Sequence, residues 1–261
     1  MKQWYRLLLG IVSGVQAILG IGFALQVPVL TSIWVFPNTT PLSFMFIGSI
    51  FAAAAASTLW CVLTGTEGAL VGIGLDYSVI LLPLGILSLQ IANGNSALLI
   101  FAVLCFLGVL FGGYMIYRGT RNPIRDRQPT PVLVRGAFAF FIIALIIVGG
   151  SMVLKVPDIM PWTISEDQSV VYGWMFLGAA VYFIYALVRP VWHNAAGQLA
   201  GFLAYDLVLI LPFLNRFTTP IPEQFILGHI IYTAVVTFSG LLAAYYLFVN
   251  PRTRILTAFA G

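Results

Sequence analysis

The chain has 261 residues, of which 61% are hydrophobic and only 8% are charged. A soluble domain usually carries charge on about 25% of its residues, so this composition excludes a soluble globular protein and indicates a chain that lies in lipid. The net charge of +4 is small and dispersed, which argues against a nucleic-acid-binding surface. The two cysteines, Cys61 and Cys105, lie in apolar segments and exclude a disulfide framework.

Eight apolar segments follow one another along the chain, each long enough to cross a hydrocarbon core of about 30 Å as a helix. Their apolar runs are continuous, which favours helices because a helix satisfies its own backbone hydrogen bonds in lipid. We therefore expect an all-α integral membrane protein with eight transmembrane helices. In chain order the predicted spans are residues 5–27, 42–64, 69–91, 97–118, 136–155, 169–189, 195–215 and 225–249.

The first span shares one feature with secretory signal peptides, since Lys2 and Arg6 precede an apolar run. The run is longer than the roughly 7–15 apolar residues of such a peptide, and no small-residue cleavage site follows it. We expect the segment to be retained as a helix.

Positively charged residues lie mostly on one side of the predicted spans. With a cytoplasmic N-terminus, only Lys155 and Arg216 face the outside, and the positive-inside rule favours this orientation. Both termini are then cytoplasmic, and we expect a multi-pass protein of the plasma membrane. The cytoplasmic cations are Lys2, Arg6, Arg118, Arg121, Arg125, Arg127, Arg135, Arg189, Arg252 and Arg254.

The second half of the sequence repeats features of the first. Glycines and prolines pair at fixed shifts, and shared hydrophobicity does not explain such pairs, so we expect a tandem duplication. Each repeat then holds four helices, an even number, so that both point the same way and a pseudo-twofold axis lies along the membrane normal. A shift of 129 pairs Arg6 with Arg135, Gly20 with Gly149, Pro28 with Pro157, Gly68 with Gly197, Gly72 with Gly201 and Pro83 with Pro212, and a shift of 128 pairs Gly112 with Gly240, Tyr117 with Tyr245 and Asn122 with Asn250.

The duplication predicts the organisation of the chain. We expect a first four-helix membrane repeat at 1–123, a cytoplasmic linker at 124–134 and a second four-helix membrane repeat at 135–261. The linker is rich in Arg and Pro, as expected of a segment that runs over the surface.

Pairs of glycines spaced four residues apart indicate where helices meet. Two bare patches on one face let helix backbones approach closely in lipid. We expect these faces to pack either within the chain or against a second copy of it. The pairs are Gly10 and Gly14, Gly68 and Gly72, Gly108 and Gly112, and Gly197 and Gly201.

Asp76 and Asp206 are the only carboxylates well within predicted spans. Each costs about 2.5–3.5 kcal/mol to insert, so each should face the interior and either bind a proton or small cation or have a structural partner. Pro83 and Pro212 follow them on the same spans and are predicted to kink the helices there. The structural alternatives are a neutral acid, pairing with Arg6, Arg118 or Arg135, or acceptance of hydrogen bonds from Ser78, Tyr77 or Tyr205.

The order of residues differs between the two acidic positions. In the shift of 129, Asp76 aligns with Tyr205, and Tyr77 aligns with Asp206. Adjacent helical positions differ by about 100°. Either a one-residue shift restores the equivalence, or the two acids point in different directions.

Two function classes fit these features, and neither of them involves catalysis. His193 and His229 are too few and too far apart for a metal or haem site, so we expect no metal and no cofactor, and His229 is either a proton relay or a buried hydrogen-bonding group. The first class is a non-catalytic subunit or scaffold that could hold a lipid or quinone, with other membrane subunits or a second copy as partners. The second is a small proton-coupled transporter that uses Asp76 and Asp206.

Overall fold

The computed structural model describes residues 1–125 and 127–255. The last residues of the second predicted repeat, 256–261, and residue 126 of the predicted linker lie outside this part of the chain. In the described ranges the fold is all helical, and the only β-type pairing is an isolated bridge between Pro129 and Val191.

Eight helices are long and apolar enough to cross a membrane, as expected of a multi-pass membrane protein, and they confirm the predicted spans to within a few residues. A further short helix, α2 (Pro28–Thr31), was not predicted and lies between the first two. The eight are α1 (Gln3–Ala24), α3 (Pro41–Thr64), α4 (Leu70–Ile91, preceded by the 3-10 turn Glu67–Ala69), α5 (Ser96–Arg121), α6 (Val132–Val153), α7 (Glu166–Val188), α8 (Trp192–Arg216) and α9 (Glu223–Ala244, continued by the π turn Tyr245–Val249).

Polar side chains at the helix starts explain several of these boundaries. The Thr40 hydroxyl accepts a hydrogen bond from the Ser43 backbone N–H, and the Asn95 side chain accepts one from the N–H of Ala97. Ser165 and Gln168 form a capping box at the start of α7. Such caps satisfy backbone donors that the first turn of a helix leaves without partners.

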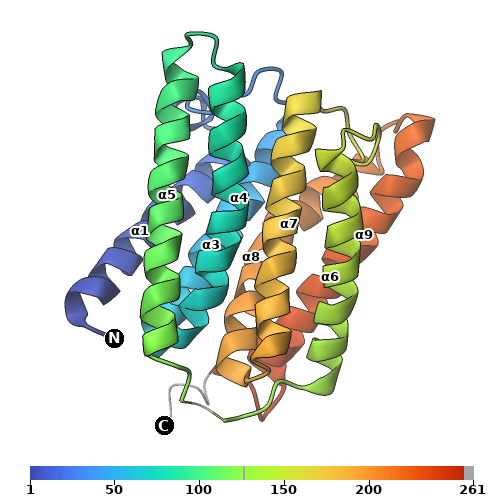
Figure 1. Cartoon of the computed structure of the whole chain (residues 1–261). Helices are drawn as coiled ribbons and strands as arrows, with labels where there is room; N and C mark the ends of the chain where they lie inside the picture. Colours follow the sequence, from blue (N-terminus) through green and yellow to red (C-terminus); the bar gives the residue numbers. More distant parts are fainter. Residues whose placement is uncertain (126, 256–261) are drawn as a thin grey trace.

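The helices form two layers of four (Figure 1). One layer runs in the order α5, α4, α7, α6, and the other in the order α1, α3, α8, α9, with close contacts between neighbours along each layer. The two central pairs, α4 with α7 and α3 with α8, each join the first half of the chain to the second. The halves are therefore joined along the whole centre of the bundle.

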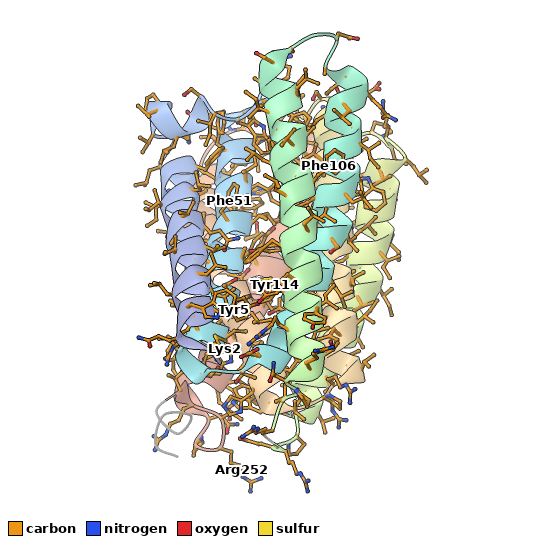
Figure 2. All side chains as sticks on the ribbon, turned by 60° about the vertical axis from the view of Figure 1, so that its left-hand side comes forward. Lys2, Tyr5, Phe51, Phe106, Tyr114 and Arg252 are labelled. Atoms are coloured by element: carbon orange, nitrogen blue, oxygen red, sulfur yellow. The ribbon has the colours of Figure 1, made fainter. Side chains whose placement is uncertain are left out.

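Aromatic side chains fill the space between the layers. Phe46 of α3 lies 4.8 Å from Tyr172 of α7 and 5.5 Å from Phe176, measured between ring centroids. At one edge of the bundle Tyr5 of α1 and Tyr114 of α5 meet edge to face, with centroids 5.5 Å apart (Figure 2). Aromatic pairs of this kind bury large areas and add directional attraction.

Hydrogen bonds at both ends of the bundle hold together segments that lie far apart in the sequence. At one end the Trp162 indole N–H donates to the Ser43 hydroxyl at 2.8 Å, and the Gln168 amide donates to the Pro37 carbonyl at 3.0 Å. At the other end the backbone N–H of Trp192 donates to the Gln128 carbonyl at 2.7 Å, which fixes the linker against the start of α8.

Candidate functional site: two carboxyl groups in the helical interior

Asp206 lies in the middle of α8, against α9. Its side chain is 3% exposed, and neither carboxylate oxygen has a hydrogen-bond partner among the described residues. Gly240 of α9 provides the space, because a Cβ built there would lie 3.2 Å from the Asp206 Cβ and 3.4 Å from Oδ2. The carboxyl group thus occupies a fitted position between two helices.

Asp76 lies on α4 and faces a different neighbour. A Cβ built at Gly178 of α7 would lie 2.6 Å from the Asp76 Oδ1, which has no hydrogen-bond partner among the described residues. Arg118, one of the partners considered for Asp76, instead binds Glu67. The two carboxyl groups therefore point to different helices, Asp76 to α7 and Asp206 to α9.

Each acid is next to a tyrosine that makes a hydrogen bond across the interior. The Gln16 amide of α1 donates to the Tyr77 hydroxyl, and the hydroxyls of Tyr205 and Tyr232 bind each other between α8 and α9. The reversed order of Asp and Tyr in the two helices thus places a tyrosine in one half where the other half has an acid.

Pro83 and Pro212 lie inside α4 and α8, between the acids and the far end of each helix. Proline has no backbone N–H to donate to the carbonyl of the residue four positions earlier, here Val79 and Val208. The His229 ring N–H, at Nε2, donates to the carbonyl of Phe213, directly after Pro212, at 2.9 Å. The backbone of α8 beyond Asp206 is therefore hydrogen-bonded to a side chain of α9.

His229 is fully buried on α9. Its ring stacks on Phe213 with centroids 5.0 Å apart, and its Nδ1 has no hydrogen-bond partner among the described residues. The backbone carbonyl of the other histidine, His193, accepts a hydrogen bond from the Trp60 indole at 3.1 Å. The histidines are in separate parts of the bundle.

Glu67, at the start of the 3-10 turn before α4, is a buried carboxylate. It is 5% exposed and accepts hydrogen bonds from both Nε and Nη2 of Arg118, at 3.1 Å and 2.8 Å, and from the Asn122 amide at 3.0 Å. The amino terminus lies 3.4 Å from its Oε1. The sequence around Glu67 gives no sign of this site, because the partners come from the amino terminus, before α1, and from the end of α5.

The glycine pairs occupy different environments. A Cβ built at Gly10 or Gly14 meets no atom within 4 Å, so this face of α1 contacts no other helix in the part of the chain that the structure describes. At the other positions the Cβ would meet a neighbouring segment: the backbone of Ile124 at Gly68, Tyr182 at Gly72, Leu81 at Gly108, the Gly74 carbonyl at Gly112, Trp60 at Gly197 and Ser57 at Gly201.

The polar groups of the interior can hold protons, but they do not form a metal site. In residues 1–125 and 127–255, no three His, Cys, Asp or Glu side chains lie close enough together to hold a metal ion. A carboxyl group with open lone pairs, beside hydroxyls that can relay hydrogen bonds, is suited to proton binding.

An open apolar groove of about 540 Å³ lies between α6 and α9 on the lipid-facing side. Its lining comes only from these two helices and includes the small residues Gly136, Ala137 and Ala234. At the opposite edge of the bundle, Trp4, Tyr5 and Tyr114 contact one another between α1 and α5.

Comparisons with known proteins assign no family to the chain: no family model matches it, and neither a curated protein nor a solved structure is similar to it.

Proposed function

We propose that the protein is a non-catalytic membrane subunit or scaffold of the plasma membrane that holds a lipid or quinone in the α6–α9 groove. The groove carries this proposal, because it is apolar, open to lipid and large enough for part of an extended apolar molecule. The alignment of the two halves of the sequence also supports the groove as the binding site. The first half has Leu7 and Phe106 at the positions where the second half has Gly136 and Ala234, so two large side chains are replaced by small ones at this edge.

The proposal includes a tandem pair of four-helix repeats with the same orientation, related by a pseudo-twofold axis along the membrane normal. The helix contacts support it, since α1 with α3 corresponds to α6 with α7, and α3 with α8 corresponds to α7 with α4. The ends of α1 and α6 support the repeat as well. Gln26 and Lys155 both have positive φ, 53° and 58°, and the next residue donates to a carbonyl five positions back in each case.

The proposed orientation places both termini in the cytoplasm. It is supported by the excess of Lys and Arg at that end of the bundle. Reporter fusions at both termini and at the loop after Arg216 test it. A fluorescent cytoplasmic reporter should be active at both termini, and a periplasmic or extracellular enzyme reporter only in the loop, whereas the reverse pattern would overturn the orientation.

Within this proposal the exposed face of α1 is the contact with another membrane subunit. Gly10 and Gly14 present two bare patches that no helix within residues 1–125 and 127–255 covers, and such patches favour close helix pairing in lipid. Native mass spectra of the protein extracted in lipid nanodiscs test the contact. A second subunit of different mass supports it, a homodimer identifies the partner as a second copy, and a solitary monomer contradicts it.

The groove is tested by filling it. Gly136→Leu introduces the side chain found at position 7, and because a Cβ at Gly136 meets no atom within 4 Å the change should be tolerated. Gly113→Leu on α5, an equally open position, is the control. Mass spectrometry of the extract measures the lipid or quinone that co-purifies with the protein. We expect the bound molecule of the wild type to be lost in Gly136→Leu and kept in Gly113→Leu. Equal retention in the two variants would disprove the groove site.

A second candidate function is a small proton-coupled transporter that uses Asp76 and Asp206. The observation that favours it is that buried oxygens of both acids have no hydrogen-bond partner among the residues that the structure describes. Under this hypothesis Asp76→Asn and Asp206→Asn abolish proton flux in proteoliposomes that carry a pH gradient, while the variants fold as the wild type. Flux that is equal in vesicles with and without the protein would exclude it.

A further inference from the structure

Two buried carboxyl groups of this protein have opposite surroundings. Glu67 is 5% exposed and is bound by the Arg118 guanidinium, the Asn122 amide and the amino terminus. Asp206 is 3% exposed, and both of its oxygens lack a hydrogen-bond partner among the described residues. The negative charge of Glu67 is balanced by neighbours, whereas a negative charge on Asp206 is not.

The chemistry around Asp206 suits the neutral acid. Burying an ionised carboxylate without a partner is costly, so such a group neutralises by taking up a proton. Ser239, the hydroxyl beside it, donates to the Val235 carbonyl at 2.8 Å in this structure, and in this orientation its oxygen is free to accept a hydrogen bond from Asp206. A protonated carboxyl group can donate to that hydroxyl oxygen, and a carboxylate cannot.

The next groups along α8 and α9 are the paired hydroxyls of Tyr205 and Tyr232. Both tyrosines are close enough to Asp206 to interact with it electrostatically, and they are the titratable groups that face it. Helix α3, which also packs on α8, contributes the Ser49 hydroxyl near Tyr205 and no charge there. Hydroxyl groups both donate and accept, so this pair can pass a proton along a hydrogen-bonded chain.

His229 lies one turn beyond Tyr232 on α9, about 4.5 Å further along the helix axis. The Phe213 ring stacks on both, with centroids 4.8 Å from Tyr232 and 5.0 Å from His229. A phenyl ring neither donates nor accepts a proton, so transfer between Tyr232 and His229 requires a bridging water or a movement of this ring. Since the ring N–H at Nε2 donates to the Phe213 carbonyl, the neutral ring has its free lone pair at Nδ1, which has no partner among the described residues. The histidine can therefore accept a proton at Nδ1. Arg216 is the charged group that lies near it, at the end of α8.

The contact between α4 and α5 in the first half corresponds to the contact between α8 and α9 in the second half, so the residues of the two contacts can be compared. In the register that pairs Gly112 with Gly240, the positions of Tyr232 and His229 correspond to Leu104 and Phe101. The series of titratable groups is thus confined to α8 and α9. We name Tyr205, Asp206, His229, Tyr232 and Ser239 the α8–α9 seam.

We propose that the α8–α9 seam is a proton-binding site in which Asp206 takes up and releases one proton, exchanging it through the tyrosine pair and His229 with the end of the bundle at residues 217–222. Uptake forms one O–H bond on a carboxylate oxygen of Asp206 and removes its negative charge, and release reverses both changes. The inference goes beyond the scaffold proposal and does not depend on the groove.

Infrared spectroscopy of the protein in lipid nanodiscs tests the site directly. At neutral pH the surface carboxylates are ionised, so a carbonyl band of a protonated carboxyl group reports a buried acid. Asp76 is a second buried acid with an oxygen that lacks a partner among the described residues, so the comparison is made in the Asp76→Asn background. We expect the band in Asp76→Asn, its loss when Asp206→Asn is added and its retention when Asp206→Glu is added instead. A spectrum of Asp76→Asn without the band, or a band that persists in the folded double variant Asp76→Asn/Asp206→Asn, overturns the proposal.

Hydrogen exchange tests the path and remains decisive if Asp206→Asn does not fold. After transfer to D₂O the carbonyl band shifts as its proton is replaced. We expect Tyr232→Phe and His229→Phe to keep the band but to slow the shift by at least about tenfold, the scale of a lost proton-transfer group. Leu104→Ala on α5 is the control and should exchange as the wild type. Equal rates in the wild type, Tyr232→Phe and His229→Phe would disprove the path.

Discussion

At the scale of single residues, the environment of a charge decides whether it stabilises the fold. The bidentate contact between Arg118 and Glu67 is largely withdrawn from solvent, with side chains 15% and 5% exposed. The pair of Lys155 and Glu166 has a similar distance of 2.9 Å but lies on the surface. Water and salt screen the surface pair, and the buried pair holds three segments of the chain together.

The contribution of the buried pair to stability can be tested by substitution. Arg118→Ala leaves the Glu67 carboxylate buried without its main partner, and we expect a loss of about 3–5 kcal/mol in the free energy of unfolding. Thermal unfolding in nanodiscs, followed by tryptophan fluorescence, measures it. Lys155→Ala is the control and should unfold at the temperature of the wild type; similar losses in both variants would contradict this account.

The surface pair also predicts a pH dependence with a definite sign. The Glu166 carboxylate beside it raises the pKa of Lys155 above its ordinary value. A raised folded-state pKa of a lysine stabilises the protein at pH values below the unfolded pKa, and the contribution disappears as the pH rises through the folded pKa. We expect a small alkaline loss of stability that Lys155→Gln abolishes, measured as the change in melting temperature with pH.

At the scale of helices, glycine spacing alone does not say which faces are used. At Gly112 an added Cβ would lie 2.8 Å from the Gly74 carbonyl oxygen, so α4 and α5 approach at backbone distance. At Gly14 the same Cβ would meet nothing. The spacing is identical, and only the packing of the neighbouring helix separates the two cases.

A pair of alanine substitutions tests this difference. Gly112→Ala forces two backbones apart, and we expect a loss of about 1–3 kcal/mol in the free energy of unfolding, the cost of overpacking. Gly14→Ala should be neutral or stabilise α1 by up to about 1 kcal/mol, since glycine is a poor helix former. Unfolding of detergent-solubilised monomers compares the two, and a larger loss in Gly14→Ala would refute the assignment.

At the scale of the whole molecule, the two halves of the chain are interlocked. The Ser57 hydroxyl donates to the Gly197 carbonyl at 3.0 Å, and the Tyr185 hydroxyl donates to the Gly68 carbonyl at 2.9 Å. Together with the contacts of α3 on α8 and α4 on α7, these bonds join the two halves along the centre of the bundle. Neither half buries its central helices alone.

This arrangement predicts the behaviour of a divided chain. We expect residues 1–123 and residues 124–261 to aggregate when each is produced alone, because the faces of α3, α4, α7 and α8 are then unpartnered. Co-expression should yield a complex that co-purifies and elutes with the intact protein in size-exclusion chromatography. A stable monomer of either half, with wild-type helical content by circular dichroism, would contradict the interlocked arrangement.

Composition and the length of the apolar runs alone determined the number and approximate bounds of the helices, because the bilayer requires runs of a certain length and internal backbone bonding. The sequence also indicated Asp76 and Asp206 as the unusual interior groups. Their surroundings depended on contacts between residues far apart in the chain. Only the tertiary structure decided that Arg118 binds Glu67, that Asp76 faces Gly178 and Asp206 faces Gly240, and that Gly10 and Gly14 stay uncovered. The rotation and depth of each helix fix these contacts, and they result from the packing of all eight helices together.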